Sequence, residues 1–369
     1  MLRRSLQYPA SQVRALSSWS SKALSHKKTS AQCLLVDGNN LLYEMYDARC
    51  QLSWNGGPTG TAMRFVKCVY DLVRAKQPQR VGIFFDTATK THRHLSNPNY
   101  KQSPTRKPMP DALRAQFDVT LHVLRALGLK VIQKPGVEAD DFIASYTKIC
   151  AADGYDVIVV SNDGDMHQLV QSPTLSPHAK QHVVIYKPTR GIYVAEKQVR
   201  KFLHGGAPSL HPGIRALCGD HWGKASGVPG GLPVPIAVSL LTEFGSLPRL
   251  LRSLNKVDDL NLRRRLQDAI SALEVSYKMS KLQENVALPV APAALDVLLP
   301  LTLDRSVLHD YLGPDGMATV LADPKNKRGK FNKRAHVFIT PEPEETLDAT
   351  TEAELDKWFD AVANGHDYK

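Results

Sequence analysis

Carboxylates that follow apolar runs constrain this chain more than any other feature. Asp37 follows CLLV, Asp86 follows VGIFF, and Asp163 and Asp165 follow VIVV within SNDGD. Short apolar runs that alternate with helical patterns predict buried strands of a parallel sheet. The carboxyl ends of such strands lie at one edge of the sheet, where open α/β folds place their sites. The sequence therefore predicts that these acids gather at one edge.

A further acid group, GVEADD, opens a predicted helix with Glu138, Asp140 and Asp141. Positions i and i+3 share a helix face, so Glu138 and Asp141 can converge while Asp140 points elsewhere. The alternatives are acidic capping of the helix dipole here and an ordinary Asp-Gly-Asn turn at Asp37. Gathered carboxylates repel unless cations neutralise them, and oxygen ligands suit Mg²⁺ or Mn²⁺. This pattern favours metal-assisted phosphodiester hydrolysis.

Alternating strand and helix patterns over residues 32–172 predict an α/β fold with a doubly wound, mainly parallel sheet. We expect a core domain at 32–184, a mainly helical region at 185–288 and a weakly ordered C-terminal extension at 289–369. The polar, basic stretch from Thr87 to about Pro110 is too long for an ordinary connection. Such a segment is functional or disordered.

The charge balance predicts a polyanionic partner. Forty-seven Lys and Arg residues against 36 Asp and Glu residues give a formal net charge of +11. A basic body around an acidic pocket suits nucleic acid held by its backbone. The alternative is that the excess comes from a cleavable leader and from solvated faces.

The N-terminal segment has the composition of a targeting sequence. Residues 1–36 are basic and Ser-rich and contain no acid. This predicts a disordered transit peptide over residues 1–31, with a mitochondrial destination favoured over a plastid. A basic arm that contacts nucleic acid is the alternative.

Several other classes of protein lack support in the sequence. The five cysteines are scattered and never form CxxC, which indicates neither a disulfide framework nor a zinc site. No segment approaches the roughly 20 apolar residues of a membrane span, so we expect no membrane partner. The G-x-S-x-G, P-loop and dinucleotide-binding motifs do not occur, which disfavours acyl transfer, nucleotide-triphosphate hydrolysis and hydride transfer.

A series of motifs resembles a known family. The order DGNN, FFD, RHxxxxxYKxxxxR, GxEADD, SNDGDxxQLV, LCGD and GVPG, from about Leu34 to Pro289, resembles 5′-to-3′ exonucleases and flap endonucleases. The nearest resemblance is to the exonuclease domain of bacterial DNA polymerase I and its freestanding relatives. It implies a PIN-like nuclease core with a helical arch at about 87–115 and a helix-hairpin-helix type DNA-binding region at 185–288. The implied activity is Mg²⁺-dependent, structure-selective 5′-to-3′ exonuclease or flap endonuclease cleavage in organellar DNA replication, repair or primer removal.

The same resemblance assigns roles to individual residues. One metal ion would be held by Asp37, Asp86, Glu138 and Asp140, supported through solvent by Asp141, and a second ion by Asp163, Asp165 and Asp220. Both ions would be Mg²⁺, for which Mn²⁺ can substitute. Lys101 and Arg106 would contact the scissile phosphate. DNA would also be contacted by Arg93 and Tyr100 of the arch and by Gly227, Gly230 and Gly231 of the hairpin. The implied partner is DNA with a 5′ flap or a single-stranded 5′ end, or an RNA-DNA hybrid, bound by a monomer.

Two departures from the family pattern have physical consequences. The family usually reads GDxxDN after the last acid, whereas this chain has Gly223 and Lys224 in those places. We therefore expect the second metal site to be weakened. The hairpin reads GVPGGLPVPIA, in which Pro233 and Pro235 remove amide donors that could bind duplex phosphates.

These departures leave two alternative functions. The first is a catalytically weakened nucleic-acid-binding descendant that serves as a subunit of an organellar assembly. The second is an RNA-directed ribonuclease of the related PIN type, against which the stretch RHLSNPNYKQSPTR argues.

Overall fold

The structure is a computed structural model that describes residues 31–49, 52–98, 100–101, 108–219 and 225–322. The expected transit peptide therefore lies outside the described residues, apart from Ala31. The four described cysteines are free. Within the described part of the chain, no helix combines the length and apolar character needed to cross a bilayer.

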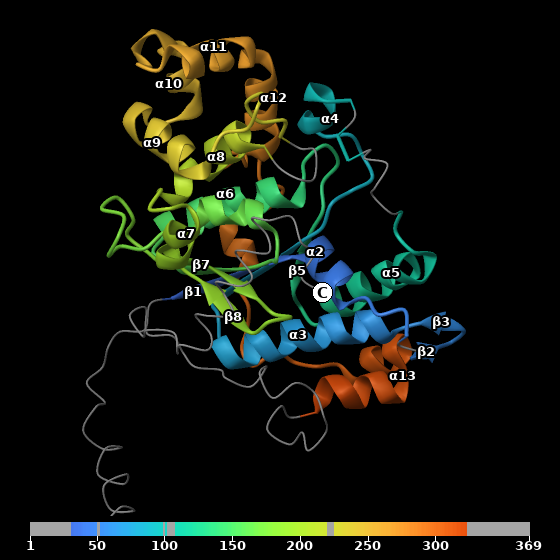
Figure 1. The fold of residues 1–369 in the computed structure, drawn as a ribbon. Coiled ribbons are helices and arrows are strands. Elements are labelled where there is room, and N and C mark those ends of the chain that lie inside the picture. Colours follow the sequence, from blue (N-terminus) through green and yellow to red (C-terminus); the bar gives the residue numbers. More distant parts are fainter. Residues whose placement is uncertain (1–30, 50–51, 99, 102–107, 220–224, 323–369) are drawn as a thin grey trace, which may run out of the picture.

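A six-stranded sheet in the order β5-β4-β1-β6-β7-β8 forms the centre of the molecule (Figure 1). Its strands are β1 (Gln32–Asp37), β4 (Arg80–Phe84), β5 (Lys130–Ile132), β6 (Asp156–Val160), β7 (Val183–Lys187) and β8 (Ile192–Val194). The first five run parallel, and β8 pairs antiparallel with β7. The strand order reverses at β1, which is typical of doubly wound sheets. The predicted α/β class is confirmed.

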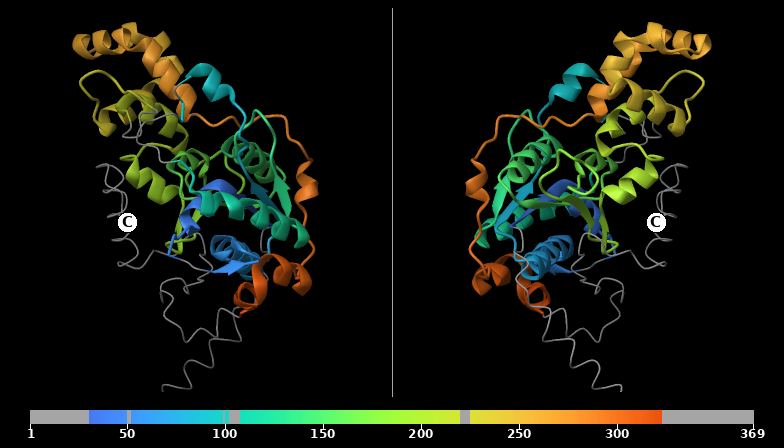
Figure 2. Two further views of the ribbon diagram at one scale, coloured as in Figure 1. Left: turned by 90° about the vertical axis from the view of Figure 1, so that its right-hand side faces the viewer. Right: turned by 90° about the vertical axis from the view of Figure 1, so that its left-hand side faces the viewer.

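Helices cover both faces of the sheet, as Figures 1 and 2 show. One face carries α2 (Gly38–Met45), α3 (Gly60–Lys76), α5 (Asp111–Ala126) and α13 (Arg305–Leu321), and the other carries α6 (Ala139–Ala152) and α7 (Glu196–Phe202). Shorter elements are the hairpin strands β2 (Ser53–Trp54) and β3 (Gly57–Pro58), the helix α4 (His92–Ser96) and the 3₁₀ helices η1 (Gly164–Leu169) and η4 (Pro292–Leu295).

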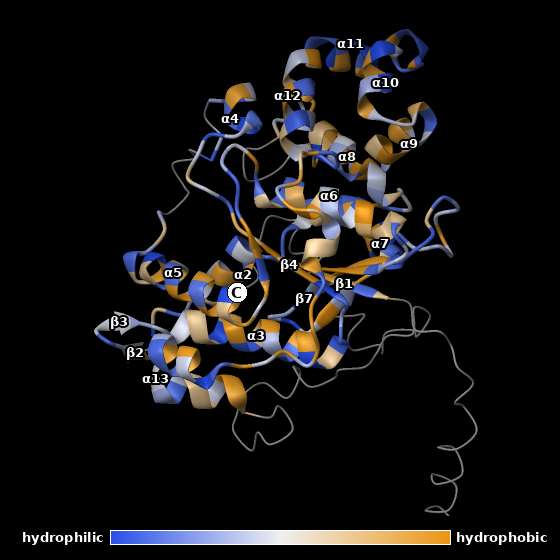
Figure 3. Cartoon of the chain, turned by 180° about the vertical axis from the view of Figure 1, so that it is seen from behind, coloured by the Kyte–Doolittle hydropathy of each residue, from blue (hydrophilic) through white to orange (hydrophobic). Residues whose placement is uncertain are grey.

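The alternation of side chains along β1 explains why both faces must be covered. Leu34 and Val36 pack into the core beneath α3, whereas Cys33 and Leu35 pack into the core beneath α6. All four are fully buried. A strand that is apolar on both faces cannot leave either face in water, so its sequence requires helices on each side. Figure 3 shows the strands as a hydrophobic band between these helices.

A helical region follows the sheet and lies beyond its carboxyl edge (Figure 1). It contains η2 (Pro208–Leu210), α8 (His211–Cys218), α9 (Val234–Phe244), α10 (Leu247–Arg252), η3 (Leu254–Lys256), α11 (Leu260–Asp268) and α12 (Ile270–Ser280). Helix α8 packs against α9 and α12, and α12 also contacts α4. Leu217, Leu241 and Leu273 are fully buried in the same core as α6. The region is therefore packed onto the sheet domain.

The boundary expected at residues 184 and 185 is wrong, because it cuts through β7. Strands β7 and β8 both belong to the central sheet, and α7 packs on it. The core therefore continues to about Phe202.

The expected weak order after residue 289 is also wrong for residues 292–322. Asp296 accepts a hydrogen bond from Arg80 Nε at 2.9 Å, and Lys67 Nζ donates to the carbonyl of Ala322 at 2.9 Å. Leu308 and Leu312 are buried against α3 and α5. The Pro- and Ala-rich composition resembles a linker, but the segment continues into α13, which packs against α3 and α5. Residues 323–369 lie outside the described chain.

We expect Leu308→Ala to lower the free energy of unfolding by about 2–4 kcal/mol, because it leaves a cavity under α13. Leu298→Ala is the matched control, since Leu298 is 92% exposed, and its effect should stay within about 0.5 kcal/mol. Urea denaturation followed by circular dichroism measures both. Equal effects of the two substitutions would contradict the packing described for α13.

Candidate active site at the carboxyl edge of the sheet

Three adjacent parallel strands each lead to an acid at the same edge of the sheet. Asp37 is the last residue of β1 and caps α2, where its Oδ1 accepts a hydrogen bond from the amide of Asn40 at 3.1 Å. Asp86 lies two residues beyond β4, and Asp163 follows β6 as the N-cap of η1. Asp37 therefore lies at the predicted position at the sheet edge, and it caps a helix there in place of the alternative Asp-Gly-Asn turn.

The glycine after Asp37 allows β1 and β4 to end in close contact. A Cβ on Gly38 would lie 2.5 Å from the ring of Phe85 and 2.7 Å from the carbonyl of Phe84. A larger residue would force the two strand ends apart. Gly38 therefore helps to keep Asp37 and Asp86 near each other.

Asp37 is held in an environment that disfavours its charge. It is 3% exposed, and its Oδ2 accepts a hydrogen bond from Ser161 Oγ at 2.8 Å. Burial raises the pKa of Asp37 to about 7, and the nearby charges of Asp163 and Asp86 raise it as well. Hydrogen bonds from Asn40 and Ser161 oppose the shift without cancelling it.

Asp140, in the first turn of α6, belongs to the same group. Burial raises its pKa well above the usual value, and the charges of Asp37, Asp163 and Asp86 add to that shift. We call Asp37, Asp86, Asp140 and Asp163 the acid cluster. The prediction assigns Asp37, Asp86 and Asp140 to one metal ion and Asp163 to a second, and the mutual electrostatic effects of these four acids place them in one region.

Glu138 contacts the arch segment with both carboxylate oxygens. Thr91 Oγ1 donates to Oε1 at 2.9 Å, while Arg93 Nη1 and Tyr100 Oη donate to Oε2 at 2.9 and 3.1 Å. Burial alone would raise the pKa of Glu138, but the charges of Lys101 and Arg93 lower it. Glu138 is therefore a charged acid that connects α6 to the arch.

Lys101 is the cation nearest to the acid cluster among these arch contacts. Its Nζ lies 3.1 Å from Asp86 Oδ2 and 3.5 Å from Glu138 Oε1. Burial alone would lower the pKa of Lys101, but the charges of Asp86, Glu138 and Asp140 raise it. Its backbone φ of 60° is unusual for a residue other than glycine. Its predicted partner, Arg106, lies outside the described residues.

Arg93 and Asp141 occupy places that differ from the prediction. Arg93 Nη1 and Nη2 pair with the two oxygens of Asp141 at 2.9 and 2.8 Å, and the two side chains are 1% and 0% exposed. Arg93 also donates to the carbonyls of Met279 and Lys281 at the C-terminal end of α12. Neither residue is open to DNA or solvent here. Arg93 therefore connects the arch, α6 and the end of α12.

Tyr100 is likewise not available to stack on a base in this arrangement. It is 6% exposed, and its hydroxyl donates to Glu138. The sequence showed a polar, basic stretch but not that α4 folds back against α12. That packing buries both Arg93 and Tyr100.

Asp165 lies next to the acid cluster, since its amide donates to Asp163 Oδ1 at 2.8 Å, and its side chain forms an ion pair with Arg215. Its Oδ1 accepts from Arg215 Nη1 of α8, and the side chains are 4% and 15% exposed. Asp220, the remaining predicted ligand of the second metal, lies outside the described residues, as do Gly223 and Lys224.

The glycine-rich loop is held mainly by the protein itself. Gly227, Gly230 and Gly231 all have positive φ values. Arg265 Nη2 donates to the carbonyls of Pro229 and Gly231, and the amide of Gly231 donates to Val228. The predicted use of this loop in DNA binding stays a prediction, and the Gly231 amide already has a partner.

The acid cluster fits a divalent cation by its chemistry. Within the described residues, no group of three or more His, Cys, Asp or Glu side chains is arranged so that it could hold a metal ion as the structure stands. The cluster nevertheless offers several hard oxygen donors with unfavourable mutual repulsion, the combination that Mg²⁺ or Mn²⁺ relieves. Lys101 provides part of that positive charge in this structure.

Sequence reasoning missed three polar groups around the site. Thr91 binds Glu138, Arg215 binds Asp165, and Lys187 Nζ donates to the carbonyl of Asn162 at 3.1 Å. Lys187 follows the apolar run HVVIY, so it carried the same strand-end signal as the acids. Arg215 carried no comparable signal, because its partner is 50 residues away.

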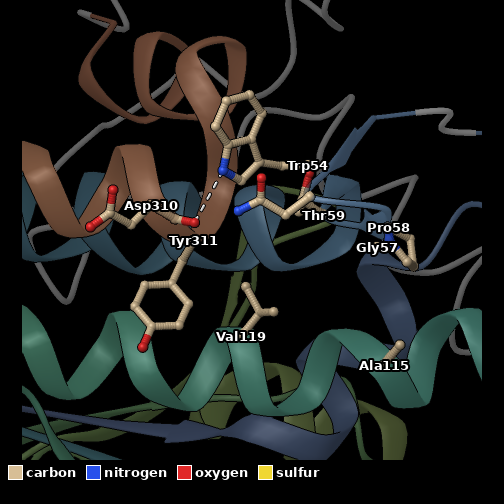
Figure 4. A pocket seen from close by; sticks show the side chains of 9 residues that line it. Trp54, Gly57, Pro58, Thr59, Ala115, Val119, Asp310 and Tyr311 are labelled. Atoms are coloured by element: carbon tan, nitrogen blue, oxygen red, sulfur yellow. Dashed lines mark hydrogen bonds between the residues drawn. The ribbon is translucent and has the colours of Figure 1, made fainter.

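A pocket among the described residues lies away from the acid cluster. A cavity of about 260 Å³ opens between the β2–β3 hairpin, α5 and α13 (Figure 4). Trp54 closes one side and donates from Nε1 to the carbonyl of Asp310 at 3.1 Å. No member of the acid cluster lines this pocket. It is therefore not the candidate active site.

Comparisons with known proteins identify relatives of this chain. Residues 32–201 match the family of 5′-3′ exonuclease N-terminal resolvase-like domains. A 5′-3′ exonuclease of Aquifex aeolicus is 29% identical over 270 residues, covering 72% of this chain and 86% of that protein. DNA polymerase I of Mycobacterium bovis is 30% identical over 299 residues, covering 78% of this chain but 31% of the polymerase.

A solved structure shows the same fold. Bacteriophage T5 flap endonuclease, in a pseudo-enzyme-product complex with DNA and metal ions, has a TM-score of 0.54 and 16% identity. The match covers 78% of this chain and 96% of that chain.

The raised pKa of Asp37 predicts how stability depends on pH. The neutral acid favours the fold below its unfolded pKa of about 3.8, and this contribution is lost as the pH rises through about 7. Asp37→Asn stays neutral, so it should gain stability relative to the parent between pH 5 and pH 8.5, by up to about 4 kcal/mol without metal.

Thermal or urea denaturation at each pH measures this difference, and added Mg²⁺ should reduce it by stabilising the charged acid. Asp118→Asn on the exposed side of α5 is the control. Parallel pH profiles for the parent and Asp37→Asn would show that Asp37 is not held in a disfavoured charge state.

Proposed function

Because the chain belongs to the 5′-3′ exonuclease family, we propose that it is a divalent-metal-dependent nuclease that cleaves DNA at single-stranded 5′ ends and 5′ flaps. The observation that carries this proposal is the acid cluster at the carboxyl edge of the sheet, with Lys101 beside it. The chain is a nuclease of the hydrolase class. An RNA-DNA hybrid is a further proposed substrate.

The acid cluster is the proposed metal-binding group, with Glu138 at its margin. Asp37, Asp86, Asp140 and Asp163 offer oxygen donors that suit Mg²⁺, and Mn²⁺ is expected to substitute. A bound ion of this kind activates water as a nucleophile and stabilises charge on the phosphate. The metal ions in the T5 flap endonuclease complex support this proposal.

Lys101 is the proposed phosphate-binding residue of this site. Its ammonium group lies at the edge of the acid cluster, 28% exposed, and can exchange its contact with Asp86 for one with a phosphate oxygen. A positive charge in that place stabilises the negative charge that develops during phosphodiester hydrolysis. Arg106 is expected to act with it.

DNA is the proposed partner because it is a polyanion and the protein carries a net positive charge. The formal net charge is +11, although acids gather at the site itself. The DNA in the T5 complex supports the same partner. The arch segment, which packs near α12 through Arg93, would lie beside the single-stranded 5′ end.

We also propose that the protein acts as a monomer in mitochondrial DNA replication, repair or primer removal. The support for the location is the basic, acid-free composition of residues 1–36. Import of a reporter fused to these residues into isolated mitochondria checks it.

A nucleic-acid-binding protein with weakened catalysis is the second candidate. The Asp165–Arg215 ion pair favours it, because it removes one acid from metal binding. Cleavage assays with a labelled 5′ flap in Mg²⁺ and Mn²⁺ separate the two candidates: binding without any product would favour the second.

We expect Asp163→Asn to lower the cleavage rate on a labelled 5′-flap substrate by at least about 100-fold, because it removes a carboxylate from the cluster. DNA binding, measured by fluorescence anisotropy in Ca²⁺, should change much less. Asp118→Asn, an acid-to-amide change on the exposed side of α5, is the control. If Asp163→Asn cleaved at the parental rate, the assigned site would be incorrect.

A further inference from the structure

We propose that Arg265 is a positioning residue that holds the glycine-rich loop, residues 226–232, with two backbone amides directed at a phosphate of duplex DNA. The proposal rests on the proposed function for DNA as the partner. It goes beyond that function by naming the side chain that sets the conformation of the loop. Arg265 belongs to α11 and acts through carbonyl groups of the loop.

The loop contains a tight turn whose residues suit its geometry. The amide of Gly231 donates to the carbonyl of Val228 at 2.9 Å, which closes a four-residue turn around Pro229 and Gly230. Gly230 has a φ of 80°. Proline in the second position and a glycine with positive φ in the third are typical of a type II turn. Pro229, Gly230 and Gly231 are exposed, so packing in the core does not hold the tip of this turn.

Arg265 holds the tip of the turn from α11. Its Nε and Nη2 donate to the carbonyl of Pro229 at 3.0 and 2.8 Å, and Nη2 also donates to the carbonyl of Gly231. A guanidinium presents its N–H groups in a rigid plane, so it can bridge two carbonyls at a fixed separation. A lysine ammonium is a point charge on a flexible stem and does not reproduce this bridge.

The two bound carbonyls determine where the amides that follow them point. The peptide bonds after Pro229 and Gly231 are trans. In a trans peptide the C=O and N–H groups point in opposite directions. The amides of Gly230 and Leu232 therefore point away from the guanidinium, and neither donates to another described residue. Neighbouring backbone amides that face the same side of a loop bind anionic oxygens, such as those of a phosphate.

The composition of the loop makes these two amides its main remaining donors. Two of the residues 229–233 are prolines, which carry no amide N–H. The amide of Gly231 is already used within the turn. The amides of Gly230 and Leu232 are what remains in this segment for a phosphate, and Arg265 fixes both of them from the opposite side. Loss of Arg265 should therefore weaken duplex binding through the loop.

The test is the affinity of the full chain and its variants for a duplex oligonucleotide, measured by fluorescence anisotropy in Ca²⁺. We expect Arg265→Ala to raise Kd by about 10-fold, the effect of losing one hydrogen bond to a charged group. Arg263→Ala is the matched control, because Arg263 Nε and Nη2 donate to the carbonyl of Val257 at 2.9 and 2.6 Å. It removes the same charge and two similar hydrogen bonds from α11 but leaves the loop held, so its Kd should stay within about twofold of the parental value.

Further measurements separate positioning from direct contact with the DNA. Direct contact between Arg265 and a phosphate would lower the slope of log Kd against log salt by about 0.9 in Arg265→Ala. We expect instead that Arg265→Ala and Arg263→Ala have equal slopes. Arg265→Lys keeps the positive charge but loses the planar group, so it should also weaken binding. With a 5′-flap substrate, Arg265→Ala should raise KM and leave kcat within about twofold, because substrate and transition state lose the same contacts.

Parental affinity in folded Arg265→Ala, or equal losses in Arg265→Ala and Arg263→Ala, would overturn the proposal. A lower salt slope in Arg265→Ala alone, or parental affinity in Arg265→Lys, would also overturn it, because the charge itself would then bind the DNA. Circular dichroism checks folding, and if Arg265→Ala does not fold, the affinity of Arg265→Lys decides. A parental chain that binds the duplex but leaves the 5′ flap uncut rejects the proposed activity alone, whereas cleavage with equal duplex affinities in parent and Arg265→Ala rejects this inference alone.

Discussion

Repulsion among carboxylates at the carboxyl edge of the sheet is the constraint on which the site depends. The parallel strands β1, β4 and β6 must end side by side, and each leads to an acid. Asp37 is nearly fully buried there, so its charge is costly without a neighbouring cation. Hydrogen bonds from Ser161 and the Asn40 amide offset only part of that cost. The fold is therefore arranged to receive positive charge at this edge.

Three basic side chains contact the acids at this edge in different ways. Arg93 takes both oxygens of Asp141 in a buried pair, and Arg215 takes Asp165. Lys101 instead contacts the acid cluster from a partly buried position on the arch. A buried pair costs much to break, because removing one partner leaves an uncompensated charge. The fixed pairs hold the scaffold together, while the exchangeable contact lies where chemistry is proposed.

The strand-end acids could be predicted from the sequence because the signal is local. An apolar run followed by Asp predicts a buried strand with an acid at the carboxyl edge of the sheet. This pattern identified Asp37, Asp86 and Asp163. The burial of Arg93 could not be predicted, because it depends on contacts with residues 45 and 48 positions away. The packing of α13 was missed for a related reason. The Pro- and Ala-rich segment that precedes it has the composition of a linker, and the contact that orders this segment, between Asp296 and Arg80, joins residues far apart in the sequence. Local composition does not reveal such distant partners.

Anomalous scattering from crystals soaked in Mn²⁺ tests most directly whether the acids form a cation site. The account predicts a peak about 2.0–2.3 Å from carboxylate oxygens of Asp86 and Asp140, with Lys101 Nζ moved away from Asp86. A saturated crystal without density at the acid cluster would contradict the account.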